Sequence, residues 1–198
     1  MSKTSIEVAP APADFVRRTL NGPAMGSRWS ATFFAPEDFD GARLLDALAA
    51  AIETVEREMS SWRPTSDLCR LNRAPIGVWT EIPLGLAEVL ATALEIGRLS
   101  EGAFDVGVGD LVQAFGFGGG ARRPDAARIA ATAGRASFEP PKTLELDRAG
   151  GRARRHAAMT IDLSGIAKGW GVDRMASVMA DFGVASFLVG IDGEMRAG

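Results

Sequence analysis

Cysteine is nearly absent from this 198-residue sequence, which contains only Cys69. A single cysteine cannot form an intramolecular disulfide, so the chain shows no oxidative cross-link and is compatible with a reducing compartment. The sequence also lacks an uninterrupted apolar run of the roughly 20 residues that are needed to span a bilayer. These two absences argue against a disulfide-stabilised scaffold and predict no transmembrane segment.

An excess of basic residues is missing too. Lys and Arg together number 22 against 25 Asp and Glu, which gives a net charge of -3. No general attraction to nucleic acid or to an anionic membrane follows from this balance, and we expect no nucleic-acid partner. The apolar fraction of 46% and the charged fraction of 24% are typical of a soluble globular protein. We therefore expect a folded domain.

The beginning of the chain carries no recognisable export signal. Residues 1–14 are rich in Ala and Pro, without the basic and then apolar pattern of a signal peptide and without a lipobox cysteine. We expect these residues to form a flexible N-terminal arm, with an ordered domain over residues 15–198. A cytoplasmic location follows, or a periplasmic or membrane-associated one if a signal has been removed.

Periodic apolar residues predict most of the regular structure. Alternation over residues 28–34 predicts a half-buried strand, and apolar residues spaced three and four apart from Leu44 to Met59 predict an amphipathic helix. Further helices are predicted from Leu86, over 124–132 with Pro124 in the first turn, and over 166–182 with Gly183 as a left-handed cap. Short strands are predicted over 144–147, 159–163 and 185–191, with a hairpin turn at Asp192-Gly193 and a basic loop at 152–155. These elements together favour an α+β fold.

The segment from Ile161 to Trp170 is the most informative for chemistry. It joins a strand to a helix through Ser164 and Gly165, which leaves backbone N–H groups and the positive end of the helix dipole facing outward. Such a helix start is suited to an anion. Lys168 lies in the first helical turn, where a cation is unfavourable unless a negative group such as a pyrophosphate is nearby. The alternative is a plain turn with Lys168 in solvent.

The glycine-rich segment 101–120 cannot be one continuous helix, because each interior glycine weakens a helix. Its glycines would let the main chain approach a flat ligand closely. Asp105 could accept hydrogen bonds from the ribose or the ring of such a ligand. Alternatively, the glycines make bulges in a strand, and Asp105 caps the next turn.

The stretch from Ser61 to Pro83 contains many helix breakers and predicts a long ordered loop. Within it, Ser66 and Asp67 indicate the start of a single helical turn. Trp62 stands at the entrance of the loop, where an exposed indole would offer a stacking platform for an aromatic ligand. The alternative is that Trp62 covers the core.

Five blocks in this order resemble the FAD:protein FMN transferase family, also called the ApbE flavin transferases. They are Met25-Gly26-Ser27, Ser60-Ser61-Trp62 with Leu71-Asn72, residues 102–106, residues 162–169, and the hairpin at 189–193. The resemblance runs from about Gly22 to Gly198. It implies a T-fold-like architecture of mixed, largely antiparallel sheets with packed helices and a flavin cleft between two lobes.

The resemblance also implies a site. Its flavin- or nucleotide-contacting positions are Met25, Trp62, Ala103, Phe104, Asp105, Asp162 and Lys168. Asp162 and Lys168 are the implied catalytic residues, and the backbone carbonyl of Gly165 is an implied ligand of Mg²⁺. This agrees with the interpretation of the helix start as a phosphate site.

The implied reaction is a magnesium-dependent transfer of FMN from FAD to a Thr or Ser hydroxyl of a target flavoprotein, with release of AMP. Mg²⁺ and Lys168 would neutralise the pyrophosphate. The family's other magnesium ligands lie in a C-terminal region that this sequence does not reach, so we expect a domain truncated at its C-terminus. The alternatives are an FAD-binding protein without transferase activity, an FAD pyrophosphatase-like hydrolase, and a degenerate fragment without a ligand.

Overall fold

The computed structural model describes residues 14–117, 123–133 and 143–198. The arm expected over residues 1–14 lies outside the described residues, except for Asp14. The chain divides into two compact units, of which the first combines Met1–Ala51 with Val172–Gly198 and the second is Ile52–Gly171. Within the described residues, no helix combines the length and the apolar character needed to cross a membrane.

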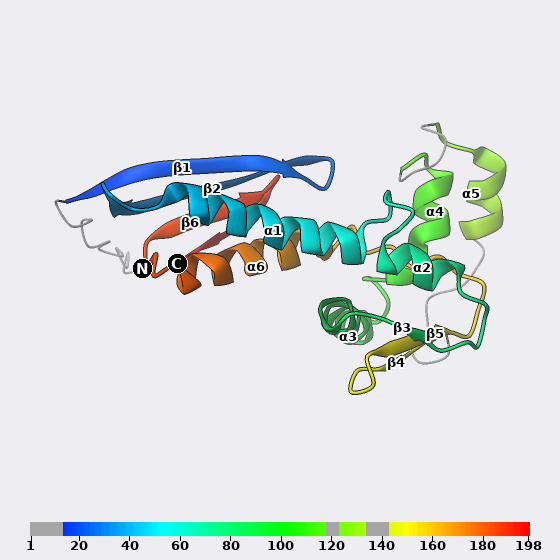
Figure 1. Cartoon of the computed structure of the whole chain (residues 1–198). Helices are drawn as coiled ribbons and strands as arrows, with labels where there is room; N and C mark the ends of the chain where they lie inside the picture. Colours follow the sequence, from blue (N-terminus) through cyan, green and yellow to red (C-terminus); the bar gives the residue numbers. More distant parts are fainter. Residues whose placement is uncertain (1–13, 118–122, 134–142) are drawn as a thin grey trace, which may run out of the picture. The chain divides into compact units, whose positions relative to one another are not determined.

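The first unit is built on a four-stranded antiparallel sheet with the order β1-β2-β6-β7 (Figure 1). Its strands are β1 (Phe15–Ala24), β2 (Ser27–Pro36), β6 (Phe187–Ile191) and β7 (Glu194–Ala197). One tight turn connects β1 to β2, and another connects β6 to β7. The β6–β7 turn contains the predicted Asp192-Gly193, and Asp192 has the positive φ of 57° that such a hairpin turn requires. The hairpin prediction is therefore confirmed.

The core of this unit lies on one face of β2. Trp29, Ala31 and Phe33 are each at most 1% exposed, as their alternation predicts. Two helices, α1 (Gly41–Met59) and α6 (Ala167–Asp181), each contribute to both units, and their first-unit parts, residues 41–51 and 172–181, cover the sheet on that side (Figure 1). Helix α6 ends at Asp181, and Gly183 beyond it has a φ of +71° and donates its N–H to the carbonyl of Ala180 at 2.9 Å. The predicted left-handed cap is thus confirmed.

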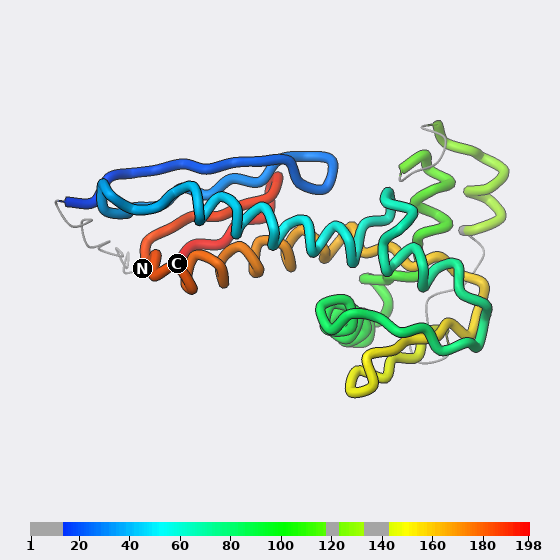
Figure 2. Tube along the Cα trace, viewed as in Figure 1, coloured from blue at the N-terminus to red at the C-terminus, as the bar shows by residue number. Residues whose placement is uncertain are grey.

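The second unit contains the other helices and a small antiparallel sheet with the order β3-β5-β4. In Figure 2 the β4–β5 hairpin, in yellow, runs beside the green helix α3. The elements are α2 (Asp67–Arg73), β3 (Thr80–Glu81), α3 (Leu84–Leu99), the 3₁₀ helix η1 (Val106–Val108), α4 (Gly109–Ala114), α5 (Ala126–Ala133), β4 (Leu144–Asp147) and β5 (Arg152–Arg155).

The prediction of a basic loop at 152–155 and a strand at 159–163 is wrong. Residues Arg152–Arg155 form β5, and 159–163 belong to no strand. Arg152 and Arg154 share one face of β5, where their guanidinium carbons lie 4.8 and 4.4 Å from the ring centroid of Trp79. They also pair with acidic side chains of β4. Stacking and charge pairing on a neighbouring strand therefore make an arginine-rich strand stable.

Three smaller differences concern two helix ends and one short strand. Helix α2 begins at the predicted cap, Ser66, whose Oγ accepts from the N–H of Cys69 at 3.0 Å, but it has seven residues instead of one turn. Pro124 precedes α5, which is capped by Asp125. The segment expected as a loop up to Pro83 also contains β3. In the glycine-rich segment, the described part breaks into η1 and α4, as expected for a segment that cannot form one helix.

Candidate functional site

The predicted anion turn joins Asp162 to the start of α6. One carboxylate oxygen of Asp162 accepts from the N–H of Ser164 at 2.9 Å, which closes a short side-chain turn. Ser164 and Gly165 are exposed, and Lys168 is half-buried in the first turn of the helix. The peptide groups of an exposed turn thus lie at the positive end of the α6 dipole, close in sequence to a cation. This is the arrangement that favours a phosphate group.

The backbone leading into this turn belongs to no strand and has no strand beside it among the described residues. The carbonyl of Thr160 accepts from the N–H of Gly109 at 3.0 Å, and the N–H of Asp162 donates to the carbonyl of Val106 at 2.8 Å. Between them, both peptide groups of Ile161 bond to the side chain of Asn72, each at 2.8 Å. The segment is therefore held by the glycine-rich region on one side and by α2 on the other.

The glycine-rich segment packs directly on the turn. A Cβ placed on Gly165 would lie 3.2 Å from Cε2 of Phe104, and one placed on Gly109 would lie 2.6 Å from the carbonyl oxygen of Thr160. Gly109 therefore cannot be replaced without moving backbone. The two motifs that the sequence analysis identified separately thus lie against each other in the second unit.

Asp105 performs the capping function that the sequence left open as an alternative. One of its carboxylate oxygens accepts from the N–H of Gly107 at 2.6 Å, and Asp105 is the N-cap of η1. The preceding residue, Phe104, is fixed through its N–H, which donates to Oγ of Ser100 at 3.0 Å. Ala103 is exposed beside them. These bonds hold the Ala103–Asp105 segment in place next to the anion turn.

Trp62 is 58% exposed, so it does not cover the core. Its loop is nevertheless well fixed, because Oγ of Ser60 accepts from the N–H groups of both Trp62 and Arg63 at 3.2 Å. Ser66 reinforces the loop by donating from its Oγ to the carbonyl of Ser60 at 2.7 Å. The indole is thus presented to solvent by an ordered backbone, as a stacking platform requires.

A cavity of about 240 Å³ lies beside Asp162. Its polar lining includes two residues that the sequence analysis did not single out, Arg73 from α2 and Gln113 from α4. Neither belongs to a block with a recognisable chemical pattern, and only the fold brings them together. The lining residues are Ser61, Cys69, Asn72, Arg73, Val112, Gln113, Thr160, Ile161 and Asp162.

Met25 differs from the other predicted site residues because it belongs to the first unit. It occupies the two-residue turn between β1 and β2 together with Gly26, and their φ values are 47° and 75°. The remaining predicted residues, from Trp62 to Lys168, belong to the second unit. Within the described residues no group of three or more His, Cys, Asp or Glu side chains is arranged to hold a metal ion.

Comparison with known proteins places these features in context. The ApbE family model matches residues 25–198. Among curated proteins, the FAD:protein FMN transferase of Vibrio cholerae is 33% identical over 194 residues, covering 93% of this chain and 55% of the relative. The FAD:protein FMN transferase of Haemophilus influenzae is 29% identical over 185 residues, covering 90% of this chain and 54% of the relative.

Solved structures give the same relationship at the level of the fold. The flavin transferase ApbE from Vibrio cholerae superposes with a TM-score of 0.84 at 29% identity, covering 92% of this chain and 59% of that one. The apo form of the flavinyl transferase ApbE from Pseudomonas stutzeri gives a TM-score of 0.80 at 28% identity, covering 95% and 62%. The expected α+β fold with largely antiparallel sheets is confirmed. The chain spans about half the length of the curated relatives that it matches.

Proposed function

This chain belongs to the ApbE family, and on that premise we propose that it contributes the FAD site of an FAD:protein FMN transferase. In the proposed reaction a Thr or Ser hydroxyl of a target flavoprotein attacks the FMN-side phosphorus of FAD. The phosphoanhydride bond breaks, AMP leaves, and the hydroxyl releases its proton to solvent as the new phosphoester bond forms. The observation that carries the proposal is the packing of the Asp162–Lys168 turn on the glycine-rich Phe104–Gly109 segment.

Lys168 and the first turn of α6 are assigned to the pyrophosphate. A cation in the first turn of a helix opposes the dipole, and a bound anion reverses that penalty. Phosphoryl transfer requires alignment and charge neutralisation more than covalent help. Asp162 shapes the turn through its bond to the N–H of Ser164, so we assign it both to nucleotide binding and to the catalytic turn.

Ala103, Phe104 and Asp105 are assigned to the nucleotide that follows the pyrophosphate. Their backbone is fixed by the bonds of Phe104 and Asp105 described above, which reduces the entropy lost on binding. Trp62 is assigned to stacking on the flavin or the adenine, since its indole is 58% exposed on an ordered loop. Met25, at the turn of the β1–β2 hairpin, is assigned to the same ligand.

Mg²⁺ is the cation that we propose for the full site. It prefers six oxygen ligands in octahedral array, and the backbone carbonyl of Gly165 offers one of them. The described residues hold no cluster of acidic side chains that would complete the set. This part of the chain therefore supplies a fraction of a magnesium site, and the charge neutralisation that can be assigned to it rests on Lys168.

Substitution of Lys168 by Ala tests the proposal. We expect FAD affinity to fall by about 1.5–3 kcal/mol, the usual value of a hydrogen bond to a charged group. Arg174→Ala is a matched control, because it removes a positive charge from an exposed position on the same helix. Equilibrium titration with FAD measures both variants. Equal affinity of wild type and Lys168→Ala would contradict the assignment of Lys168 to the pyrophosphate.

Product analysis tests the reaction itself. Incubation of the protein with FAD, Mg²⁺ and a target flavoprotein should release AMP in step with covalent flavin on the target. Free FMN in place of labelled target would identify a hydrolase. Bound FAD with no AMP would identify a flavin-binding protein without transferase activity.

A further inference from the structure

Ile161 has an unusual set of hydrogen-bond partners. It is fully buried, yet the described residues provide no strand next to it. Buried peptide groups must be paired, because an unpaired one costs about as much as a lost hydrogen bond. A side chain that satisfies both of them therefore determines where this backbone can lie.

Asn72 is that side chain. Its Nδ2 donates to the carbonyl of Ile161, and its Oδ1 accepts from the N–H of Ile161, each at 2.8 Å. This is the same pair of bonds that a residue of a neighbouring antiparallel strand would exchange. A carboxamide suits this task because it is neutral and carries a donor and an acceptor side by side. The two residues are 89 positions apart in the sequence.

Helix α2, which carries Asn72, is itself fixed in place. Ser66 caps the helix, and Leu68 and Leu71 are fully buried. The residue after Ile161 is Asp162, whose own N–H is held by the carbonyl of Val106. A shift of Ile161 would therefore move Asp162 and the turn that leads to Lys168.

We propose that Asn72 is a positioning residue for the site, acting through the backbone of Ile161 on Asp162 and the anion turn. Its effect on FAD rests on the proposed function, whereas its effect on the backbone does not. The two can therefore be measured separately.

Asn72→Asp is the most informative variant, because a protonated carboxyl has nearly the shape and the hydrogen-bonding groups of a carboxamide. The ionised form still accepts from Ile161 N–H but sets a negative charge against the carbonyl oxygen. We expect FAD affinity to fall roughly tenfold or more at pH 8 through loss of the donor. Recovery toward wild type is expected near pH 5, since burial favours the neutral acid.

Other titratable groups near this position are shared by wild type and variant. Asp162, Arg73 and Cys69 line the same cavity, and Asp110 accepts from Thr160 Oγ1 at 2.6 Å. The ratio of the two affinities at each pH removes their contribution. Asn21→Asp is the matched control, because Asn21 is exposed on β1, and its ratio should not depend on pH in this way.

Amide hydrogen exchange gives the readout that does not depend on FAD. The N–H of Ile161 should be protected in wild type, lose protection in Asn72→Asp at pH 8 and regain it at low pH, relative to the amides in the core of α3. Rapid exchange of Ile161 in the wild-type protein would overturn the proposal even if the variant fails to fold. Wild-type FAD affinity in Asn72→Asp at pH 8 would overturn it too. Absence of FAD binding by the wild type would refute the proposed function and leave the exchange test of Asn72 intact.

Discussion

At the scale of single residues, Met25 stands out by its backbone. Its φ of 47° is followed by 75° at Gly26, the combination of a two-residue hairpin turn in which Asn-Gly is strongly preferred. A methionine is poorly suited to the left-handed region, and residues held there are often functional. The turn alone therefore does not account for this side chain, which agrees with the contact to FAD proposed above.

Met25→Asn should separate stability from binding. The asparagine relieves the backbone conformation, so we expect a gain of about 0.5–2 kcal/mol in the free energy of unfolding. FAD affinity should fall at the same time, because the apolar contact is lost. Urea unfolding and FAD titration of the same preparation measure the two effects. An affinity equal to that of wild type would show that Met25 does not touch the ligand.

Asp105 allows its two possible roles to be distinguished with two variants. Asp105→Asn keeps an oxygen that accepts from the N–H of Gly107, whereas Asp105→Ala removes the cap and should cost about 1 kcal/mol of stability. If the carboxylate contacts the nucleotide, both variants should bind FAD more weakly, and this is the outcome we expect. Thermal unfolding measures the stability of both variants, and FAD titration measures their affinity. Wild-type affinity in Asp105→Asn would show that Asp105 acts only as a helix cap.

The sequence could not decide between these roles for Asp105, because an aspartate beside glycines is suited both to a cap and to a ligand. By contrast, Ser66, Gly183 and Asp192-Gly193 were predicted correctly as cap, helix end and hairpin turn. Those features depend on the backbone conformation of a few neighbouring residues, which local sequence specifies well. The contacts of a carboxylate depend on distant parts of the chain.

At the scale of elements, the errors have one physical cause. The predicted strand at 159–163 has the apolar pattern of a strand, but among the described residues its backbone pairs with Asn72, η1 and the first residue of α4 and not with a strand. The strand β5 lacks an apolar pattern, yet Trp79 and the acids of β4 stabilise its arginines. Periodicity reports which side chains are buried, and it does not report which partner satisfies the backbone.

The β4–β5 hairpin should loosen in acid. The hydrogen bond from His156, at 2.7 Å, and those from Arg154 lower the pKa of Glu145 below its ordinary value. A folded-state pKa below the unfolded one stabilises the protein above the ordinary carboxyl range, and the gain is lost as the pH falls through the folded value. We therefore expect the protection of the hairpin amides, taken relative to their intrinsic exchange rates at each pH, to fall below about pH 4.

Glu145→Gln should flatten this acid dependence, and exchange measured between pH 3 and pH 6 provides the test. Part of the dependence should remain, because the N–H of Gly150 and the guanidinium of Arg152 lower the pKa of Asp147 on the same hairpin. An identical pH profile in wild type and Glu145→Gln would show that the Glu145 pairs contribute nothing to the hairpin.

At the scale of the whole molecule, the α+β class and the positions of α1, α3 and α6 followed from periodicity, which the spacing of buried residues determines. Periodicity did not show which residues form the two units, although the family resemblance implied two lobes. The first unit joins the beginning and the end of the chain, and the cavity beside Asp162 combines α2, α4 and the Thr160 segment. Such groupings depend on contacts between residues far apart in the sequence, and the pattern of a single sequence does not show these contacts.

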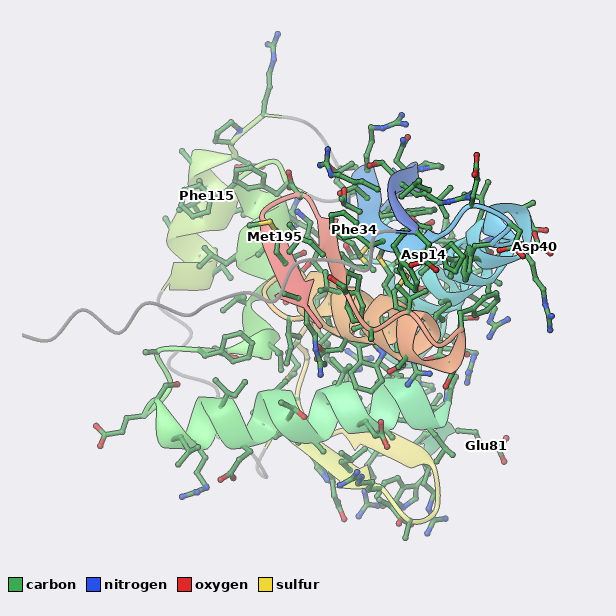
Figure 3. The ribbon with its side chains drawn as sticks, turned by 90° about the vertical axis from the view of Figure 1, so that its left-hand side faces the viewer. Asp14, Phe34, Asp40, Glu81, Phe115 and Met195 are labelled. Atoms are coloured by element: carbon green, nitrogen blue, oxygen red, sulfur yellow. The ribbon has the colours of Figure 1, made fainter. Side chains whose placement is uncertain are left out.

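Met195 belongs to an exposed edge of the four-stranded sheet (Figure 3). All four residues of β7 are exposed, Met195 at 68%, and Leu188 on the neighbouring strand at 46%. Exposed edge strands that carry apolar side chains such as Met195 recruit other strands. We expect Met195→Lys to reduce concentration-dependent self-association, with a change in stability within about 0.5 kcal/mol.

Analytical ultracentrifugation over a range of concentrations measures this effect. Leu84→Lys is the control, because Leu84 is equally exposed, at 69%, but begins a helix. Equal association of wild type and Met195→Lys would show that the edge of β7 does not mediate contacts between copies.

The tryptophans give the two units separate optical signals. Trp29 is the sole tryptophan of the first unit and is 1% exposed, whereas Trp62, Trp79 and Trp170 belong to the second. An indole in a dry core emits at short wavelength and is out of reach of acrylamide, while the indole of Trp62 meets the quencher freely. Emission that survives a high acrylamide concentration should therefore come mainly from Trp29. Unfolding of the first unit can thus be followed in the intact chain without a label. The second unit is followed by the part of the tryptophan emission that acrylamide quenches.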